Sequence, residues 1–502
     1  MASVTLRAGI SSGLSLAQGA LLVVGKNKHL KNVNYKQVQN ALNGFVDEKL
    51  WQTAIEQLPE SGNIPLYLNQ AKIVSIPDKV SRHNAPSGAV NIFREVRDAS
   101  FGKGSKALNV VLFADYADVI PSVAAIARSF PLYSRKTGQI GNGVKDINVD
   151  VVITDGKVLT ECDLSFLDSL VKSIRTTGRL IDTPANVLTT DALVKEAEET
   201  AAQLGVKCTV IRGEDLLSQG FGGIYHVGKA GPTPPAFVVL SHMPNGAYET
   251  YALVGKGVVY DTGGMQIKGK TGMPNMKRDM GGAAGMLGAF ATLVKSGFKQ
   301  NLHTCLCIVE NNISPAANKP DDIITMLSGK TVEINNTDAE GRLILADGVY
   351  YAKHTLKATT IIDMATLTGA QAHLSGKLHG AVLTNSDIWE RQLVEAGRRS
   401  GDLLAPMVFC PDLHFPDLKS PIADMKNSNL GKMEVMKTGP PSAIAGLFIG
   451  AHIEFGEGLN WIHLDIAAPA ESADRGTGFG PALLSVLLGN QTTVPLLQPY
   501  HE

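Results

Sequence analysis

The chain has 502 residues, of which 44% are hydrophobic and 19% are charged, so it is long enough for two to four domains with large cores. Its 46 basic and 47 acidic residues leave a formal net charge of −1. A near-neutral chain without a basic run has little electrostatic attraction to nucleic acid or to an anionic membrane, so neither partner is expected. No apolar stretch approaches the roughly 18 residues that a membrane-spanning helix needs.

The N-terminal part alternates strand-like and helix-like segments. Apolar β-rich runs predict strands at residues 21–24, 109–113 and 149–153, and apolar residues at helical spacing predict helical segments at residues 35–58 and 122–130. This alternation indicates βαβ units with a mostly parallel sheet. The region carries no chemical motif, so residues 1–163 are predicted to form an α/β domain with a scaffolding or oligomerisation role.

A connecting helix is predicted over residues 164–181, because its leucine, isoleucine and valine residues recur on one face. Pro184 follows and favours a turn. We place the domain boundary along this helix. The βα alternation then resumes, and residues 182–502 are predicted to form a second, larger α/β domain with a mixed central sheet.

The five cysteines do not form a disulfide or metal-binding pattern. They are Cys162, Cys208, Cys305, Cys307 and Cys410. Cys305 and Cys307 alternate within the apolar run 302–309, which predicts a buried strand with both thiols on one face. The first 19 residues are rich in serine, but one arginine is too few for an organellar transit peptide. We therefore expect a reducing, cytoplasmic location.

The first segment with candidate chemistry is residues 254–264, which Lys268 and residues 277–284 follow. Val and Tyr residues at 251–260 predict a strand that ends at Asp261, before a glycine-rich turn. Ligands of open α/β sheets bind at the carboxyl ends of strands, so Asp261 is well placed for one. Asp279 lies at the start of the next predicted helix, where the helix dipole favours an acid.

The second segment is residues 335–342, in which Asp338 and Glu340 stand two residues apart. In an extended segment or a turn, this spacing points both carboxylates to one side. With Asp261 and Asp279 they would form a mutually repelling group, and two divalent cations would relieve that repulsion. Lys256 can join them as a neutral amine ligand, because a metal ion favours the deprotonated form.

The types of these ligands bear on the metal and on how specific the pattern is. Zinc prefers nitrogen and sulfur ligands, and no histidine is among the candidates, so ligand type alone favours magnesium or manganese. A single Asp at a strand end is usually a turn former, and a single Lys is usually solvated. The combination of five such residues in two short segments is what indicates a metal site.

Residues 336–343, with the sequence NTDAEGRL, are similar to the signature octapeptide of the leucine aminopeptidase family of two-metal exopeptidases. The similarity extends over Lys256, Asp261, Gly263, Gly264, Lys268 and residues 279–284, 365–370 and 463–467. It covers residues 182–502, while the preceding part is similar in layout only. The loop 268–278 most resembles the animal aminopeptidase-like branch of that family.

The resemblance implies a set of metal ligands. Asp261 and Glu340 would bridge two metal ions, Lys256 and Asp279 would complete one site, and Asp338 would complete the other. In the family the metals are usually zinc, with one site exchangeable with manganese, magnesium or cobalt. The resemblance therefore predicts zinc in place of the magnesium or manganese that ligand type favoured, except at the exchangeable site.

The resemblance also implies the reaction. Lys268 would polarise the scissile carbonyl, and Arg342 would hold a bicarbonate-like anion that acts as general base. A metal-bridging water would attack the N-terminal peptide bond of peptides with apolar, leucine-like first residues. The free α-amine of the substrate would ligate a metal, which accounts for an exopeptidase. The family forms hexamers, so a homohexamer is expected.

The candidate substrate-binding residues follow from the same resemblance. They are Met276, Asn336, Thr366, Leu367, Gly369, Ala467 and Ala470. Ala470 replaces a bulkier residue that is common in the family, and this replacement bears on the depth of the pocket for the first side chain.

Three alternative functions have less support in the sequence. Residues 264–271 satisfy the P-loop pattern G-x-x-x-x-G-K-[ST], but Gly272 and Pro274 follow, so no helix can begin at Thr271 to hold a phosphate. A non-catalytic member of the family is the second alternative, although every expected ligand and both basic catalytic residues are present. Serine or cysteine nucleophiles have no supporting motif.

Overall fold

The structure is a computed structural model that describes residues 2–42, 44–99, 107–137, 145–431 and 436–498. The chain divides into two compact units. Unit 1 contains the chain up to Arg175, the segment Ala396–Leu403 and the chain from Thr493 onward, and unit 2 contains Thr176–Glu395 and Leu404–Thr492. The division falls inside helix α6 (Glu161–Asp182), which is the helix predicted over residues 164–181.

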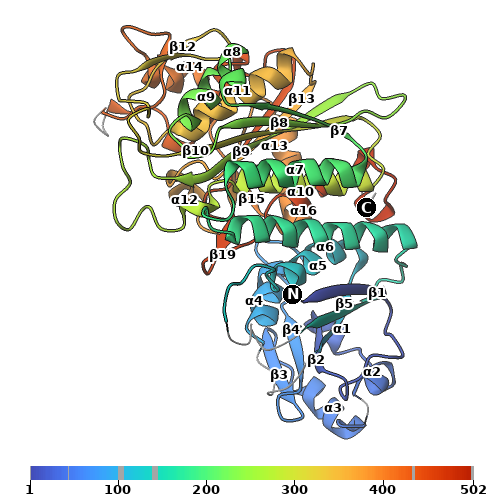
Figure 1. Ribbon diagram of the computed structural model, residues 1–502. Coiled ribbons are helices and arrows are strands. Elements are labelled where there is room, and N and C mark those ends of the chain that lie inside the picture. The colour runs from blue at the N-terminus through green and yellow to red at the C-terminus, as the bar shows by residue number, and fades with distance from the viewer. Residues whose placement is uncertain (1, 43, 100–106, 138–144, 432–435, 499–502) are drawn as a thin grey trace. The chain divides into compact units, whose positions relative to one another are not determined.

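Unit 1 is built on a six-stranded sheet in the order β1-β6-β5-β2-β4-β3 (Figure 1). All neighbouring strands are parallel except β3 and β4, which are antiparallel. The mostly parallel sheet predicted for this part of the chain is therefore confirmed. The strands are β1 Ser3–Ala8, β2 Ala20–Lys26, β3 Gly62–Leu66, β4 Ala71–Ile76, β5 Ala107–Ala114 and β6 Asp146–Ile153.

The helices of unit 1 agree with the sequence pattern except at one place. They are α1 Asn27–Leu30, α2 Tyr35–Leu42, α3 Glu48–Glu56, α4 Ala89–Arg97, α5 Val119–Arg128 and the 3₁₀ turn η1 Tyr116–Asp118. The helical segment predicted at 35–58 is two helices, because Gly44 has a left-handed φ of 74°. Asp47 then caps α3 by accepting a hydrogen bond from the Leu50 N–H at 2.8 Å.

Unit 2 is built on an eight-stranded sheet in the order β15-β14-β17-β13-β9-β10-β8-β7. Its centre, from β17 to β10, is parallel, while β7, β8 and β14 introduce antiparallel pairs. The mixed sheet predicted for the larger domain is thus confirmed. The strands are β7 Lys207–Arg212, β8 Ala236–His242, β9 Thr250–Asp261, β10 Asn301–Asn311, β13 Thr360–Ala365, β14 Gly380–Thr384, β15 Leu404–Pro406 and β17 Asn460–Asp465.

Helices cover both faces of this sheet, with α7 and α10 below β8 to β10 and α9 and α11 above them in Figure 1. The α-helices that begin in this unit are α7 Thr190–Leu204, α8 Glu214–Ser218, α9 Gly222–Gly228, α10 Gly281–Lys295, α11 Glu340–His354, α12 Ala370–Ser375, α13 Asp387–Ser400, α14 Pro411–His414, α15 Pro441–Ala451 and α16 Pro481–Leu487. Short strands form two small sheets, β11 Ile323–Thr325, β12 Thr331–Glu333 and β16 Met425–Lys426 in one, and β18 Glu471–Ser472 and β19 Arg475–Gly476 in the other.

Glycine allows helix α10 to lie against the central strand β9. A Cβ on Gly255 would lie 2.5 Å from the Ala283 Cα, and a Cβ on Gly282 would lie 2.0 Å from the Met364 carbonyl oxygen. Side chains at these two positions would push the helix away from the sheet. Their absence brings the start of α10 close to the end of β9.

The remaining expectations about the chain concern cysteines and membranes. Cys305 and Cys307 are fully buried in β10, as the alternation predicted, and all five cysteines are free thiols. Within the described residues, no helix has both the length and the apolar character needed to cross a bilayer.

Asp347, in the middle of α11, is expected to be important for the stability of unit 2. Its fully buried carboxylate accepts hydrogen bonds from the Ile224 N–H at 3.0 Å and the Leu327 N–H at 2.9 Å. Asp347→Asn would turn an amide N–H₂ toward one of these donors. We therefore expect the free energy of unfolding to fall by about 1–3 kcal/mol at pH 8. Chemical denaturation measures this loss, and Asp387→Asn, on the exposed surface of α13, is the control.

The same variant has an expected pH dependence. Burial raises the pKa of Asp347 to about 7, against the opposing effect of the N–H donors. Because this value lies above that of an unfolded Asp, about 4, the stabilisation from this group falls as the pH rises from about 4 to about 7. The difference between wild type and Asp347→Asn should therefore be larger at pH 5 than at pH 8. An equal difference in stability between wild type and Asp347→Asn at the two pH values would contradict the assignment.

Candidate active site

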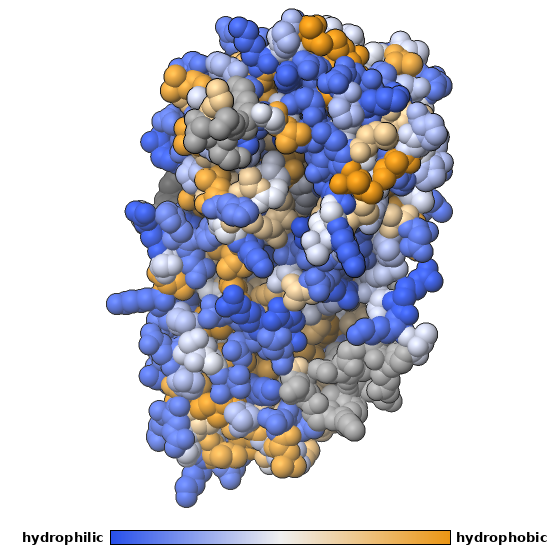
Figure 2. Space-filling model, turned by 90° about the vertical axis from the view of Figure 1, so that its left-hand side faces the viewer, coloured by the Kyte–Doolittle hydropathy of each residue, from blue (hydrophilic) through white to orange (hydrophobic). Residues whose placement is uncertain are grey.

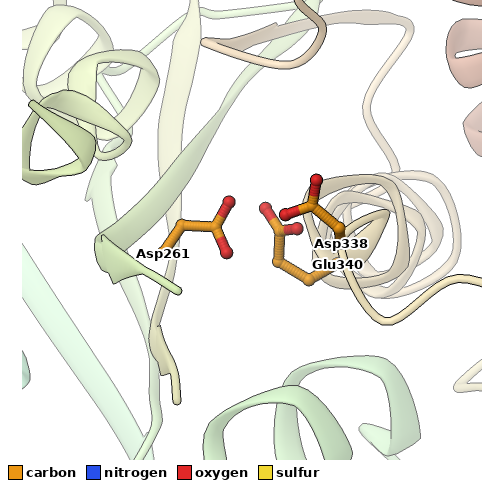
Figure 3. Close-up of side chains that lie close together, drawn as sticks. All are labelled: Asp261, Asp338 and Glu340. Atoms are coloured by element: carbon orange, nitrogen blue, oxygen red, sulfur yellow. The ribbon is translucent and has the colours of Figure 1, made fainter. Parts of the chain in front are cut away.

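Three carboxylates meet at the carboxyl edge of the central sheet of unit 2. Asp261 is the last residue of β9, and Asp338 and Glu340 lie in the turn and the first residue of α11. Their side chains point toward one another from opposite sides (Figure 3), with one oxygen of each within 4.8 Å of the others. Two segments 77 residues apart in sequence, counted from position 261 to position 338, thus form one acidic group.

Lys256 lies beneath this group on β9 and is almost fully buried, at 2% exposure. Its Nζ lies 2.7 Å from Asp279 Oδ2 and 2.8 Å from Glu340 Oε1. It also donates a hydrogen bond to the Thr366 carbonyl at 3.1 Å. Gly341 makes room for it, because a Cβ at that position would lie 2.6 Å from Lys256 Cε.

Lys268 contacts the other side of the group from the loop that follows β9. Its Nζ lies 2.7 Å from Asp261 Oδ2 and 2.5 Å from Asp338 Oδ1. The side chain is 16% exposed, and that of Asp338 is 37% exposed, so solvent reaches the cluster at this side. Lys268 is thus placed at the open edge of the cluster, whereas Lys256 is placed at its base.

The electrostatics show an excess of negative charge. Burial, together with neighbouring carboxylates, raises the pKa of Asp261 and raises that of Asp279 well above the usual range. Burial also raises the pKa of Asp338, with Asp261 adding to the effect. Burial alone would lower the pKa of Lys256 and of Lys268, but the surrounding carboxylates raise both. Both lysines are therefore protonated, and their positive charges offset part of the negative charge of the carboxylates.

The residues present fit a pair of divalent cations. Four carboxylates and two lysines contact one another here, so acidic side chains outnumber basic ones. The second oxygen of Glu340, Oε2, is buried and has no hydrogen-bond partner in the described structure. A buried anionic oxygen without a donor is costly unless a cation binds it. Carboxylate oxygens with a displaceable lysine amine form a donor set for divalent metal ions.

Arg342 lies in the first turn of α11 and is buried, with 9% exposure. One of its terminal nitrogens donates a hydrogen bond to the Asn427 carbonyl at 3.0 Å, and its Nε is buried with no partner in the described structure. Burial lowers the pKa of Arg342 to about 10, although Glu340 and Asp465 oppose that change. The guanidinium therefore keeps donors free for an anion.

The candidate substrate-binding residues lie on four segments of unit 2. Thr366 and Ala470 come together at the start of α10, since a Cβ on Gly281 would lie 3.2 Å from Thr366 Cγ2 and 3.6 Å from Ala470 Cβ. The backbone N–H groups of Leu367 and Ala467 both donate to Asp465 Oδ1, at 3.1 and 3.2 Å.

Of the other three candidates, Met276 and Asn336 lie on two further segments, and Gly369 lies on the same segment as Thr366 and Leu367. Met276 begins the 3₁₀ turn η2 (Met276–Arg278) and is half-buried, and Gly369 is exposed at the start of α12. The Asn336 side chain accepts a hydrogen bond from the Asp338 N–H at 2.9 Å, so it shapes the turn that carries Asp338. No hydrogen bond in the described structure joins Met276 to the other candidates.

The structure adds supporting residues that the sequence did not single out. Asn311, the last residue of β10, donates to Asp261 Oδ1 at 2.8 Å and to the Thr337 carbonyl at 3.1 Å. Asn427 donates to the Asn336 carbonyl at 2.6 Å and accepts from the Asn335 and Asn336 N–H groups. The position of Asn311 at the end of a neighbouring strand was a usable signal, whereas nothing in the sequence marks Asn427.

The segment after Lys268 bears on the nucleotide-binding alternative. Residues 269–275 are turns and irregular chain, the turn η2 begins at Met276, and α10 begins only at Gly281. No helix begins at Thr271, as the glycine and proline there predicted. The P-loop reading has no helix N-terminus to hold a phosphate.

Both parts of the chain match known aminopeptidase domains. Residues 175–485 match the cytosol aminopeptidase family, catalytic domain, and residues 19–139 match the M17 aminopeptidase N-terminal domain 2. Leucine aminopeptidase 1 of Caenorhabditis elegans is 61% identical over 503 residues, covering 99% of this chain and 100% of that protein. The probable aminopeptidase NPEPL1 of Homo sapiens is 47% identical, covering 99% and 95% respectively.

Solved structures show the same fold. The structure of Caenorhabditis elegans leucine aminopeptidase has a TM-score of 0.94 and 62% identity, and covers 99% of this chain and 100% of that chain. The bottromycin maturation enzyme BotP in complex with Mn has a TM-score of 0.74 and 25% identity, and covers 94% of this chain and 99% of that chain. The chain therefore belongs to the cytosol, or leucine, aminopeptidase family and is a metal-dependent aminopeptidase.

Proposed function

We propose that this aminopeptidase releases single apolar, leucine-like residues from the N-termini of peptides, using two divalent cations in each chain. The observation that carries the proposal is the acidic group at the carboxyl edge of β9, where Asp261, Asp338 and Glu340 lie within 4.8 Å of one another with Lys256 beneath them. Such a group is costly in the protein interior without cations.

Five residues would hold the metal ions. Asp261 and Glu340 would bridge them, with Lys256 and Asp279 at one site and Asp338 at the other. Lys256 would have to lose its proton to bind a metal ion. Its Nζ lies between Asp279 and Glu340, and this position among the other proposed ligands supports its role as a ligand. We propose zinc, with one site exchangeable with manganese, magnesium or cobalt. When bound, such ions acidify a shared water to a near-neutral pKa and so supply the nucleophile.

The basic residues of the chain act on the substrate. Lys268 lies at the open edge of the cluster, from where its ammonium group would donate to the carbonyl oxygen of the scissile bond as negative charge develops there. Arg342, with a buried Nε that lacks a partner, would bind a bicarbonate-like anion. That anion would take up the proton released during attack.

The substrate pocket would be formed by the segments that surround the cluster. Thr366 and Ala470 lie together beside the start of α10, and the side chain of Ala470 is fully buried. We propose that a small residue at this position makes room for a branched or long apolar first side chain. Met276, Asn336, Leu367, Gly369 and Ala467 are proposed to complete the pocket.

We also propose a cytoplasmic homohexamer, as the family name and the resemblance suggest. Exposed large apolar side chains on unit 2 support association: Val408, Leu413, Ile422, Leu430 and Met436 are 51–64% exposed. Figure 2 shows orange apolar residues at the surface among blue hydrophilic ones. Contact with other copies would remove such side chains from water. Light scattering should give a mass of about six chains, and a stable, fully active monomer would contradict the proposal.

The requirement for a free N-terminus tests the reaction. Leucyl peptides and their N-acetylated counterparts should be compared at equal concentration, with release of free leucine as the readout. A free α-amine can ligate a metal ion, so we expect cleavage of the leucyl peptides with a free N-terminus and no cleavage of the acetylated ones. A panel of first residues then gives the preference. Equal cleavage of the acetylated peptides, or release of internal fragments, would contradict an exopeptidase.

A further inference from the structure

Asp465 is a buried carboxylate for which metal binding and catalysis give no role. It is the last residue of β17, where it pairs with Ala365 of β13 on one side and Ala381 of β14 on the other. Its side chain is fully buried. A buried charge is costly unless several donors satisfy it, so its partners reveal what it holds in place.

Five hydrogen bonds converge on this carboxylate. Oδ1 accepts from the N–H groups of Leu367 at 3.1 Å, Thr368 at 3.4 Å and Ala467 at 3.2 Å. Oδ2 accepts from the hydroxyls of Thr368 at 2.6 Å and Ser442 at 2.7 Å. Hydrogen bonds to an ionised acceptor are about twice as strong as neutral ones.

Four of these five bonds come from the two segments proposed to line the substrate pocket, and the fifth comes from Ser442 on α15. Residues 366–369 follow β13 and residues 466–470 follow β17, and Asp465 is bonded to both. Gln371 makes a second link, since its Oε1 accepts from the Ala468 N–H at 2.8 Å and its own N–H donates to the Thr368 hydroxyl at 3.2 Å. The spacing between the two segments is thus fixed by side chains as well as by the sheet.

We propose that Asp465 is a positioning residue that sets the width of the pocket for the first side chain by clamping residues 366–369 to residues 466–470. The inference rests on the proposed function, because it concerns the same pocket. Asp465 acts through Leu367, Thr368 and Ala467 and does not itself touch the substrate.

Two variants loosen the clamp in different ways. In Asp465→Asn the amide oxygen can still accept from the N–H groups and the amide nitrogen can donate to the two hydroxyls, so the fold is retained while the charge is lost. Thr368→Val keeps the side-chain shape and removes the shortest of the five bonds. The matched control is Asp363→Asn, another fully buried carboxylate of the sheet, which is bonded to His463 and Trp461.

The experiment measures kcat and KM for substrates that begin with leucine, alanine and phenylalanine, together with metal content and unfolding midpoint. We expect both variants to raise KM for the substrate that begins with leucine about 5–10-fold. Their kcat should stay within about threefold of the wild-type value, and their metal content should be unchanged. The preference for leucine over alanine in kcat/KM should fall by a similar factor. Asp363→Asn should lower the unfolding midpoint without changing the preference.

The possible results separate the two proposals. Wild type that cleaves none of the substrates would overturn the proposed function and this inference with it. Active wild type, with unchanged KM and unchanged preference in both variants, would overturn the inference alone. The same would follow if Asp363→Asn changed the preference as much as Asp465→Asn, because the effect would then be a general loss of stability.

Discussion

Lys268→Ala is expected to lower turnover by about 10²–10³-fold while metal content stays near normal. Lys268 is not among the proposed metal ligands, so its loss should leave the metal ions in place. Its Nζ lies at the open edge of the cluster, between Asp261 and Asp338, where the carbonyl oxygen of a substrate would gain negative charge. Loss of that donor should affect kcat more than KM.

Arg342→Ala is expected to lower turnover by about 10²–10⁴-fold, again with near-normal metal content and assembly. The reason is loss of the anion that would act as general base, which the free Nε of Arg342 would help to hold. Arg342→Lys keeps the charge without the planar fork and should recover only part of the activity.

The controls for both variants lie on the same elements. Lys270 is exposed in the loop that carries Lys268, and Lys353, on α11 with Arg342, contacts Glu454 near the surface. Their alanine variants should retain wild-type turnover. If Lys268 and Arg342 were instead structural partners of the acidic group, their loss would remove metal or destabilise the fold. Activity that falls in proportion to metal content would therefore contradict the roles assigned here.

Removing a bridging ligand is the second change with a large expected effect. Asp261→Ala and Glu340→Ala should abolish activity and bring the metal content close to zero, since each carboxylate would serve both ions. Asp338→Ala should remove mainly one ion, because Asp338 would serve a single site and its side chain is already 37% exposed. Metal analysis of the purified chains gives the stoichiometry, and the exposed Asp387→Ala is the control. Equal metal loss in all three variants would contradict the division into bridging and terminal ligands.

Much of the site followed from local sequence. The Val-rich run before Asp261 predicted a strand end, where the structure has it, and Asp338 lies in a turn as expected, whereas Glu340 already begins helix α11. Strand ends of a parallel sheet share one edge, so segments far apart in sequence could be assigned to one site. The small residues that follow Asp279 allow the close approach of α10 to β9.

The rest depends on contacts between distant segments. Asn427 supports the turn at Asn336 through bonds across 91 positions, and Asp465 holds the N–H of Leu367 from 98 positions away. A buried Asn or Asp in a single sequence looks like any other polar residue, because only the fold shows which backbone groups it must satisfy. The break between α2 and α3 was missed for a related reason. The apolar spacing continued across it, and the left-handed Gly44 interrupted the helix.

The most direct test of the central claim is a reconstitution series on the wild-type chain. Metal is removed by chelation, zinc or manganese is returned in steps, and bound metal and leucyl-peptide cleavage are measured on the same samples. We expect no activity in the metal-free chain, and activity that rises with bound metal to a plateau at two ions per chain, because the acidic group at Asp261, Asp338 and Glu340 would hold both. Full activity in the metal-free chain would contradict the account.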